Sequence, residues 1–530
     1  MQTFKFHRAQ TDLFSSQQVR ISYDQESILP FIERTFSEGN LLKQTELKGE
    51  TFSKESREIL VEALRDQYME TCISELTDQN ISSLLDENTF TITTGHQLSL
   101  FTGPLFFVVK ILHVIKLCEQ LSEQNPDKKF VPVYWMATED HDFEEIQSLN
   151  IFNRDIVWNS EQQGPVGRFK LDEGFEAAKS EIKSFFRDEH EEVLQLIKSY
   201  DGSNLAEATR NLVQEIFDQY GLVIIDGDNR SLKQTFASIV EKELRSSFSF
   251  DAVSVSTSKM EKEGLAPQIN PREINLFYIE DGLRSRIIKE GHKFEIQGKG
   301  SFSIDELLEI LRESPESFSP NVVLRPLYQE VILPNIVYIG GGSEITYWLQ
   351  LKGVFDHCEV PYPLINIRNS VLWIDSTISS KIAKCDLKLE DVFKQTDLLK
   401  REYVEANEGE ALDFETIDSA REQLRKEIDV LIAEVDPGLD KYARSECSKL
   451  EKQVEGIKSK LMRTSKKKHD DAMKAIDSVK DRLFPDNGLM ERKVNFFQFA
   501  ADGQVRSKIE MLYSALEPFE NDLIVIRDVN

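Results

Sequence analysis

Residues 90–142 read FTITTGHQLSLFTGPLFFVVKILHVIKLCEQLSEQNPDKKFVPVYWMATEDHD and contain two β-rich runs separated by a long apolar helix. The first run covers 90–93, the helix about 105–121 and the second run 130–136. The sequence Asn125-Pro126-Asp127 ends the helix before the second run begins. Because a strand, a crossover helix and a second strand form the repeating unit of a parallel sheet, this stretch predicts an α/β fold.

The same alternation returns further along the chain. Strands are expected at 222–226, 322–324, 336–339 and 363–367, and helices at 55–69, at 75–85 and from the glycine turn at 340–344 to about 355. The sheet is therefore expected to be assembled from at least three separated segments. A β-hairpin is predicted by two apolar runs, 274–279 and 284–288, that flank the turn Glu280-Asp281-Gly282.

The chain changes character at about residue 376, where glycine nearly vanishes and charge density rises. Apolar residues then recur at spacings of three and four from Ile417 to Val435 and from Cys447 to Leu461, with the turn Asp436-Pro437-Gly438 between them. This spacing is typical of a coiled coil, here an antiparallel helical hairpin. The apolar tail 523–526 is expected to add an edge strand.

These patterns divide the chain into an interrupted α/β core, two insertions and a coiled coil. The expected bounds are 1–150, 221–260 and 321–375 for the core, 151–220 and 261–320 for the insertions, 376–490 for the coiled coil, and 491–530 for a C-terminal segment that returns to the core.

The composition excludes several classes of function. The 530 residues carry a net charge of −28, which opposes binding to nucleic acid and to anionic membranes. The most apolar stretch, 104–118, is broken by three basic residues and is shorter than the ~18–20 residues of a membrane span. The first residues do not resemble a signal peptide, and the five cysteines show no CxxC spacing. We therefore expect a cytoplasmic protein with reduced cysteines.

The first candidate site is the turn Gly95-His96-Gln97, between the strand at 90–93 and the helix that follows. Free amides and a partial positive charge at a helix N-terminus favour phosphate or carboxylate, and glycine lets a ligand approach the backbone closely. The preceding residues make this a T-x-G-H variant of the H-x-G-H motif of class I adenylate-forming and nucleotide-transferring enzymes. The alternative is an ordinary turn with a partly buried histidine.

The second candidate site is the run Glu139-Asp140-His141-Asp142, at the end of the strand at 130–136. Parallel sheets place their ligands at this end of their strands. A histidine beside carboxylates can act as an oriented base, and the same groups can bind Mg²⁺. The alternative is a polar loop whose carboxylates cap the next helix.

Two further candidates lie later in the chain. The glycine run Gly340, Gly341 and Gly342 leads into a helix that carries Glu344 and Tyr347. It lacks the G-x-x-x-x-G-K-[ST] and G-x-G-x-x-G patterns, so a flexible ligand-binding turn or a purely structural turn remains. The run Arg325-Pro326-Leu327-Tyr328-Gln329-Glu330 follows an expected strand, and its Arg325 is suited to clamp a carboxylate or phosphate; surface or structural ion pairing is the alternative.

Four segments together resemble the BshC family of cysteine ligases in bacillithiol biosynthesis. They are TTGHQLSLFTGPLFFVVKI, PVYWMATEDHDFEEI, RPLYQEVILPNIVYIGGGSEITYWLQLKGVF and FPDNGLMERKVNFFQF. The resemblance implies a Rossmann-like core with two connecting domains and a coiled coil that forms a homodimer. It also implies that cysteine is joined through its carboxylate to the amine of glucosaminyl-malate. Activation is expected from ATP, with Mg²⁺ as an option and without a bound organic prosthetic group.

The resemblance also implies site residues. Gly95, His96 and Gln97 match the T-G-x-Q turn of the family, Asp140, His141 and Asp142 match its E-D-H-D segment, and Gly340, Gly341, Glu344 and Tyr347 match its G-G-x-x-E-I-x-Y-W turn. Glu139 or His141 would take the proton of the attacking amine, and Arg325 would pair with a carboxylate or phosphate. No K-M-S-K-S loop is present. A class I-like nucleotidyltransferase and a coiled-coil scaffold with a degenerate core are the alternative functions.

Overall fold

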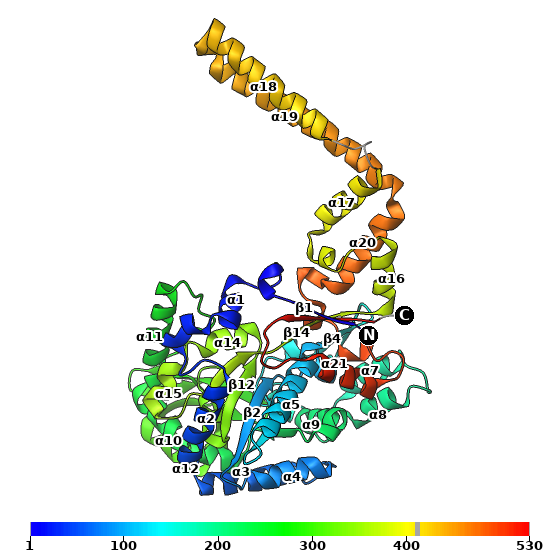
Figure 1. The fold of residues 1–530 in the computed structure, drawn as a ribbon. Coiled ribbons are helices and arrows are strands. Elements are labelled where there is room, and N and C mark those ends of the chain that lie inside the picture. The colour runs from blue at the N-terminus through cyan, green and yellow to red at the C-terminus, as the bar shows by residue number, and fades with distance from the viewer. Residues whose placement is uncertain (1, 409–413, 529–530) are drawn as a thin grey trace. The chain divides into compact units, whose positions relative to one another are not determined.

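The core of the fold is a parallel five-stranded sheet in the order β13-β12-β2-β3-β6 (Figure 1). Its strands are β2 (Thr89–His96), β3 (Lys129–Met136), β6 (Val223–Asp226), β12 (Asn335–Gly340) and β13 (Leu364–Ile367). These strands confirm the sequence predictions at 90–93, 130–136, 222–226, 336–339 and 363–367. The computed structural model describes residues 2–408 and 414–528.

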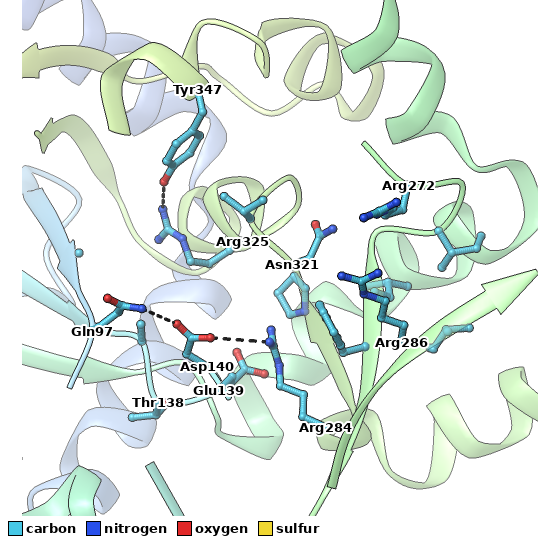
Figure 2. Close-up of a pocket in the computed structure, with 18 of the residues that line it drawn as sticks. Gln97, Thr138, Glu139, Asp140, Arg272, Arg284, Arg286, Asn321, Arg325 and Tyr347 are labelled. Carbon is cyan, nitrogen blue, oxygen red and sulfur yellow. Dashed lines mark hydrogen bonds and ion pairs between the residues drawn. The ribbon is translucent and has the colours of Figure 1, made fainter. Parts of the chain in front are cut away.

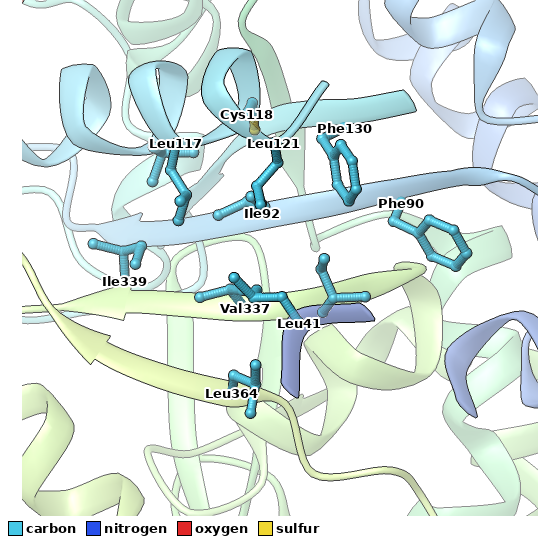
Figure 3. Packing of buried hydrophobic residues seen from close by; sticks show 12 residues of the cluster. Leu41, Phe90, Ile92, Leu117, Cys118, Leu121, Phe130, Val337, Ile339 and Leu364 are labelled. Atoms are coloured by element: carbon cyan, nitrogen blue, oxygen red, sulfur yellow. The ribbon is translucent and has the colours of Figure 1, made fainter. Parts of the chain in front are cut away.

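Helix α5 (Phe106–Gln124) makes the crossover from β2 to β3 and packs on both strands. Its Leu117, Cys118 and Leu121 lie over Ile92 of β2 in the main apolar cluster (Figure 3). Helix α2 (Glu38–Thr51) adds Leu41 to the same cluster. The predicted N-terminal helices are present as α3 (Lys54–Gln67) and α4 (Glu75–Ser83). The strands are buried along nearly their whole length, as in a parallel sheet covered on both faces, and the four threonines of β2 are buried with the apolar residues.

Two long segments interrupt the sheet. The first, between β3 and β6, contains α6 (Phe143–Ile146), the hairpin β4 (Ser148–Ile151) and β5 (Arg154–Val157), and the helices α7 (Glu173–Lys183), α8 (Glu191–Ser199) and α9 (Leu205–Phe217). The second, between β6 and β12, begins with α10 (Arg230–Ser246) and α11 (Phe248–Lys262).

The second segment also holds an antiparallel sheet in the order β10-β9-β8-β7-β11. Its strands are β7 (Leu276–Glu280), β8 (Leu283–Glu290), β9 (Lys293–Ile296), β10 (Gly300–Ser303) and β11 (Phe318–Pro320), and α12 (Ile304–Glu313) follows β10. The predicted hairpin is confirmed as β7 and β8. Its two-residue turn places Gly282 at φ +75°, a conformation that glycine adopts without strain.

Three predictions of local structure are wrong. Residues 322–324 form a turn before α13 (Arg325–Ile332), because Pro326 fits the first turn of a helix and starts one there. The helix expected from the glycine turn at 340–344 to about 355 is broken into α14 (Gly342–Trp348) and α15 (Lys352–Cys358). The tail forms β15 (Leu523–Arg527), which lies between β1 (Gln2–Phe6) and β14 (Ser370–Ile374) and is therefore a central strand.

The chain divides into two compact units. One consists of Thr3–Leu372 and Met490–Ile526, and includes the parallel sheet and α21 (Val505–Ala515); the other consists mainly of Trp373–Leu489. In the second unit, α18 (Glu415–Val435) and α19 (Asp440–Lys468) pair antiparallel, as the ion pairs Arg421–Glu455 and Arg425–Glu451 show. The predicted coiled-coil hairpin is thus confirmed.

The rest of this unit contains three helices that pack around a small apolar core. Helices α16 (Ser376–Lys384), α17 (Thr396–Glu408) and α20 (Asp470–Leu483) supply an apolar cluster that includes Cys385, Leu399 and Ile476. Across the described ranges, the helices are all too short or too polar to cross a membrane.

Candidate active site

A cavity of about 780 Å³ opens at the carboxyl ends of β2, β3 and β12. The end of β2 contributes Gly95 and His96, and the end of β3 contributes Trp135 and Met136. Strands β7 and β8 of the second insertion supply the facing wall (Figure 2). Open α/β sheets bind their ligands at this edge, so the cavity is the candidate active site.

The structure places the residues predicted from the sequence in two groups. Those that line the cavity are Gly95, His96, Gln97, Glu139, Asp140, Arg325, Glu344 and Tyr347. Those that lie outside its lining are His141, Asp142, Gln329, Gly340, Gly341 and Gly342. Segments more than 200 residues apart in the sequence therefore meet in one place.

Asp140 presents an ionised carboxylate to the cavity. Its Oδ2 accepts a hydrogen bond from Gln97 Nε2 at 2.9 Å, and its Oδ1 accepts one from the backbone N–H of His141 at 2.8 Å. Arg284 Nη1 lies 3.9 Å from Oδ1. Burial alone raises the pKa of Asp140, but these hydrogen bonds and the charge of Arg284 lower it well below its ordinary value. Asp140 is thus a poor proton acceptor and a good partner for a cation.

The other three residues of this run, Glu139, His141 and Asp142, differ in their contacts. Glu139 forms an ion pair with the buried Lys233, which also donates to the carbonyl of Phe318 at 2.7 Å. Arg284 Nη1 lies 2.7 Å from His141 Nδ1, and since a guanidinium only donates, this imidazole nitrogen accepts. Asp142 precedes α6 and makes no capping hydrogen bond. Glu139 is thus engaged by Lys233, whereas His141 Nδ1 lies 3.7 Å from Asp140 Oδ1 and shares Arg284 with it.

Arg325 places a guanidinium in the cavity without a carboxylate partner among residues 2–408 and 414–528. It lies between the rings of Trp135 and Tyr338, 5.7 Å from each centroid. Nη1 donates to Gln329 Oε1 at 3.1 Å, and Nη2 donates to the Tyr347 hydroxyl at 3.4 Å. Gln329 thus acts on Arg325 from outside the cavity. A half-buried cation with neutral partners only is a natural site for an anionic group.

Glu344 faces the cavity and forms an ion pair with the buried Lys110. The ammonium of Lys110 donates to Glu344 Oε1 at 2.6 Å and to the Gly95 carbonyl at 2.7 Å, and the Tyr338 hydroxyl donates to Glu344 Oε2 at 2.8 Å. Burial raises the pKa of Glu344, but the charge of Lys110 brings it below the ordinary value. A Cβ on Gly341 would lie 3.3 Å from Glu344 Oε1, so this glycine leaves room for the carboxylate.

His96 is the neutral group of the site. Burial and the charge of Lys110 lower its pKa to about 3, so the imidazole stays uncharged at neutral pH. Within the described part of the chain, its Nε2 has no hydrogen-bond partner. Phe106 packs edge-on against the ring at 5.1 Å. The side chain can therefore offer a ligand a hydrogen bond, but not a positive charge.

Sequence reasoning missed several residues of this site, among them Lys110, Arg272, Arg284 and Arg286. Lys110 follows four apolar residues at the start of α5, and a lysine buried in such surroundings needs an acidic partner. Arg284 and Arg286 stand two apart on β8, so they share one face of the strand. That alternation was visible in the sequence, but the position of the hairpin over the cavity was not.

Fold and cavity together define a Rossmann-like α/β protein with a coiled-coil unit and a cavity at the carboxyl ends of its parallel strands. Residues 6–369 match the family description "Bacillithiol biosynthesis BshC, N-terminal Rossmann-like domain", and residues 371–527 match "Bacillithiol biosynthesis BshC, C-terminal coiled-coil domain". The chain belongs to the BshC family of bacillithiol biosynthesis, as the sequence segments indicated.

Relatives along nearly the whole chain bear the name "Putative cysteine ligase BshC". The protein of Flavobacterium johnsoniae is 38% identical over 98% of both chains. That of Flavobacterium psychrophilum is 41% identical over 86% of this chain and 87% of its own, and that of Cytophaga hutchinsonii is 39% identical over 87% of both.

Proposed function

We propose that this chain is a ligase that joins the carboxylate of cysteine to the amine of glucosaminyl-malate. Family membership supports the reaction class. One observation carries the assignment to this cavity: the ionised Asp140 and the unpaired guanidinium of Arg325 line the same space. Cysteine is a zwitterion, and the acceptor combines an amine with carboxylates, so both substrates need a site with both signs of charge.

Asp140 and Arg325 divide the work of holding the substrates. The low pKa of Asp140 keeps its carboxylate ionised, so it holds an ammonium group rather than taking a proton from one. The planar fork of Arg325 suits a carboxylate or phosphate, and Gln329 and Tyr347 fix its orientation. Placing both reacting groups in one cavity lowers the entropic cost of their encounter.

Amide formation from a free carboxylate is uphill in water, and we assign the activation to ATP as a co-substrate. Arg325 fits this assignment, because its charge has no carboxylate partner in the described residues and it lies where α/β folds hold phosphates. When bound, ATP supplies the free energy that turns a carboxylate oxygen into a leaving group. Arg325 then stabilises the negative charge near that oxygen.

Glu139 and His141 act as positioning residues in this proposal. Glu139 forms an ion pair with Lys233, and His141 accepts a hydrogen bond from Arg284. Each residue thereby fixes the position of a basic side chain at the cavity wall. The neutral His96 contributes a hydrogen bond to the bound substrate. Gly95 lets ligand atoms approach the end of β2, where an added Cβ would lie 3.3 Å from the Tyr338 hydroxyl.

The test is to supply purified protein with ATP, cysteine and glucosaminyl-malate, and to detect the thiol product by mass spectrometry after thiol labelling. The D140N variant should lose about 10- to 100-fold in kcat/KM, since removing a charge-assisted contact costs about 1.5–3 kcal/mol and the neutral amide keeps the shape of the side chain without its charge. D142N is the matched control, because Asp142 lies outside the cavity lining. No amide product with any nucleoside triphosphate, or a product that carries a nucleotide, overturns the proposal.

We further propose that the hairpin of α18 and α19 pairs with the same hairpin of a second copy. Large apolar side chains are exposed along it, among them Val435 at 78%, Tyr442 at 66% and Leu431 at 58%. A groove on it is lined mainly by apolar residues: Ile428, Ile432, Leu439, Tyr442, Ala443, Cys447 and Leu450. Sedimentation velocity should find a dimer that L431K weakens and that the matched control Q423K leaves intact; a monomeric wild type refutes the pairing.

A further inference from the structure

The second insertion supplies two arginines to the cavity that have no role in the proposed reaction. Arg272 and Arg286 line the cavity, and neither forms an ion pair with any residue of the described ranges. Figure 2 shows both on the side of the pocket away from Gln97, Asp140 and Tyr347. The cavity therefore has two parts. One is formed by the strand ends of the core, and the other, which we call the arginine wall, by Arg272 and Arg286 of the insertion.

The hairpin that carries Arg286 is anchored at its turn by ion pairs and a close backbone contact. Arg168 bridges Asp228 of the core at 2.8 Å and Asp281 at the tip of the β7–β8 hairpin at 3.0 Å. At the same tip, a Cβ on Gly164 would lie 2.7 Å from the backbone nitrogen of Leu283, so the two backbones are in close contact. Since the hairpin is anchored at its turn, the side chains of β8 face the cavity in a defined direction.

Arg284 links this wall to the core part of the site. Its side chain is 8% exposed, and its guanidinium carbon lies 3.9 Å from the centroid of the Phe277 ring. It contacts His141 and lies near Asp140, so its charge is already partly balanced. Arg286, two residues further along the same face of β8, has no such partner. The uncompensated charge of the wall therefore resides on Arg272 and Arg286.

Arg272 and Arg286 are both exposed where they line the cavity, so each guanidinium is accessible to an anion that enters it. A chain with a net charge of −28 offers many carboxylates, yet within the described residues none pairs with either group. Carboxylates bind arginine in a bidentate fork, and two forks match two carboxylates. The arginine wall is thus suited to bind a small dicarboxylate.

We propose that Arg272 and Arg286 form a dicarboxylate subsite, which holds the malate end of the acceptor while its amine lies in the core part of the cavity. The identity of the acceptor rests on the proposed function; the dicarboxylate chemistry rests on the wall alone. The subsite makes the protein select an amino sugar that carries a dicarboxylic acid over the same amino sugar without it.

Isothermal titration calorimetry of the full chain tests the subsite with four probes: glucosaminyl-malate, L-malate, glucosamine and ATP. R272Q and R286Q should each weaken glucosaminyl-malate and malate about 10- to 100-fold, the effect of losing one charge-assisted contact. Glucosamine, which lacks the acid, should bind the variants and the wild type alike. R312Q is the matched control, because Arg312 is an exposed arginine of the same insertion outside the cavity lining.

The outcomes separate the two proposals. Unchanged malate and glucosaminyl-malate affinity in R272Q and R286Q, with folding verified by circular dichroism, overturns the subsite whatever the activity. A loss confined to ATP also overturns it, because the arginines would then bind phosphate. If the variants lose malate binding but the wild type forms no amide, the subsite stands and the proposed reaction fails. In an active enzyme, R286Q should raise KM for the acceptor far more than it lowers kcat.

Discussion

Replacing Lys110 by methionine tests the ion pair beneath the cavity. The ammonium is 1% exposed and donates to Glu344 at 2.6 Å and to the Gly95 carbonyl at 2.7 Å. Methionine keeps the length of the side chain, so the main change is the loss of the charge. Removing one member of a buried ion pair costs about 3–5 kcal/mol, and because Glu344 is 28% exposed we expect the lower end, about 3 kcal/mol.

Urea unfolding followed by tryptophan fluorescence measures this loss, because Trp135, Trp158 and Trp348 are buried in the unit that contains the cavity. The double variant K110M/E344Q is the matched control, since a neutral amide needs no counter-charge, and it should regain at least half of the lost stability. A loss below about 1 kcal/mol in K110M, or a double variant as unstable as the single one, refutes the reasoning.

The same variant has a pH dependence of known sign. In the wild type, the charge of Lys110 holds the pKa of Glu344 below its ordinary value. Without Lys110, burial raises that pKa above the value in the unfolded chain. The penalty is then fully present at neutral pH and shrinks as pH falls and Glu344 takes up a proton. Unfolding at pH 7.5 and pH 5 should show the smaller loss at pH 5.

Three further predictions concern Arg325, Gly164 and Asp226. R325M should lower kcat/KM at least about 100-fold while Q329A costs about tenfold, since the first removes the anion-binding charge and the second only its orientation; steady-state kinetics with equal losses would contradict this order. G164A should loosen the β7–β8 hairpin, because its backbone has φ +94° and no room for a Cβ. Faster limited proteolysis at the hairpin is expected, and an unchanged cleavage pattern argues against the anchor. Burial and the nearby Asp228 raise the pKa of Asp226 to about 6, so stability should fall as pH rises through 6 in the wild type, and D226N should flatten that fall in thermal unfolding curves.

Much of the fold was predictable because it rests on short-range patterns. The stretch 90–142 holds a complete strand–helix–strand unit, and the heptad-like spacing between 417 and 461 requires only neighbours along two helices. The errors arose where a local pattern was too short to decide. Residues 322–324 are apolar enough for a strand, yet Pro326 starts a helix directly after them. The tail at 523–526 is central because its neighbours come from residues 2–6 and 370–374.

The strand-end positions of the site were also predictable, since parallel strands present their carboxyl ends at one edge. Gly95 lies at the end of β2, Asp140 and Glu344 follow β3 and β12, and all three line the cavity. Their partners were not predictable. Lys110 comes from α5 and Arg284 from β8, and no spacing in the sequence relates either residue to the carboxylate that it contacts.

By itself, the sequence determined the parallel core, the coiled-coil hairpin, the family and the strand ends at which a ligand would bind. Periodicity and turn chemistry act over a few residues, so they can be seen without the fold. Only the tertiary structure decided which of the adjacent acids keeps a carboxylate free for the cavity. Lys233 neutralises Glu139, while Gln97 and Arg284 keep Asp140 ionised and facing the cavity. The pKa and the contacts of a charged side chain depend on the groups around it in space, and folding brings those groups together from distant parts of the chain.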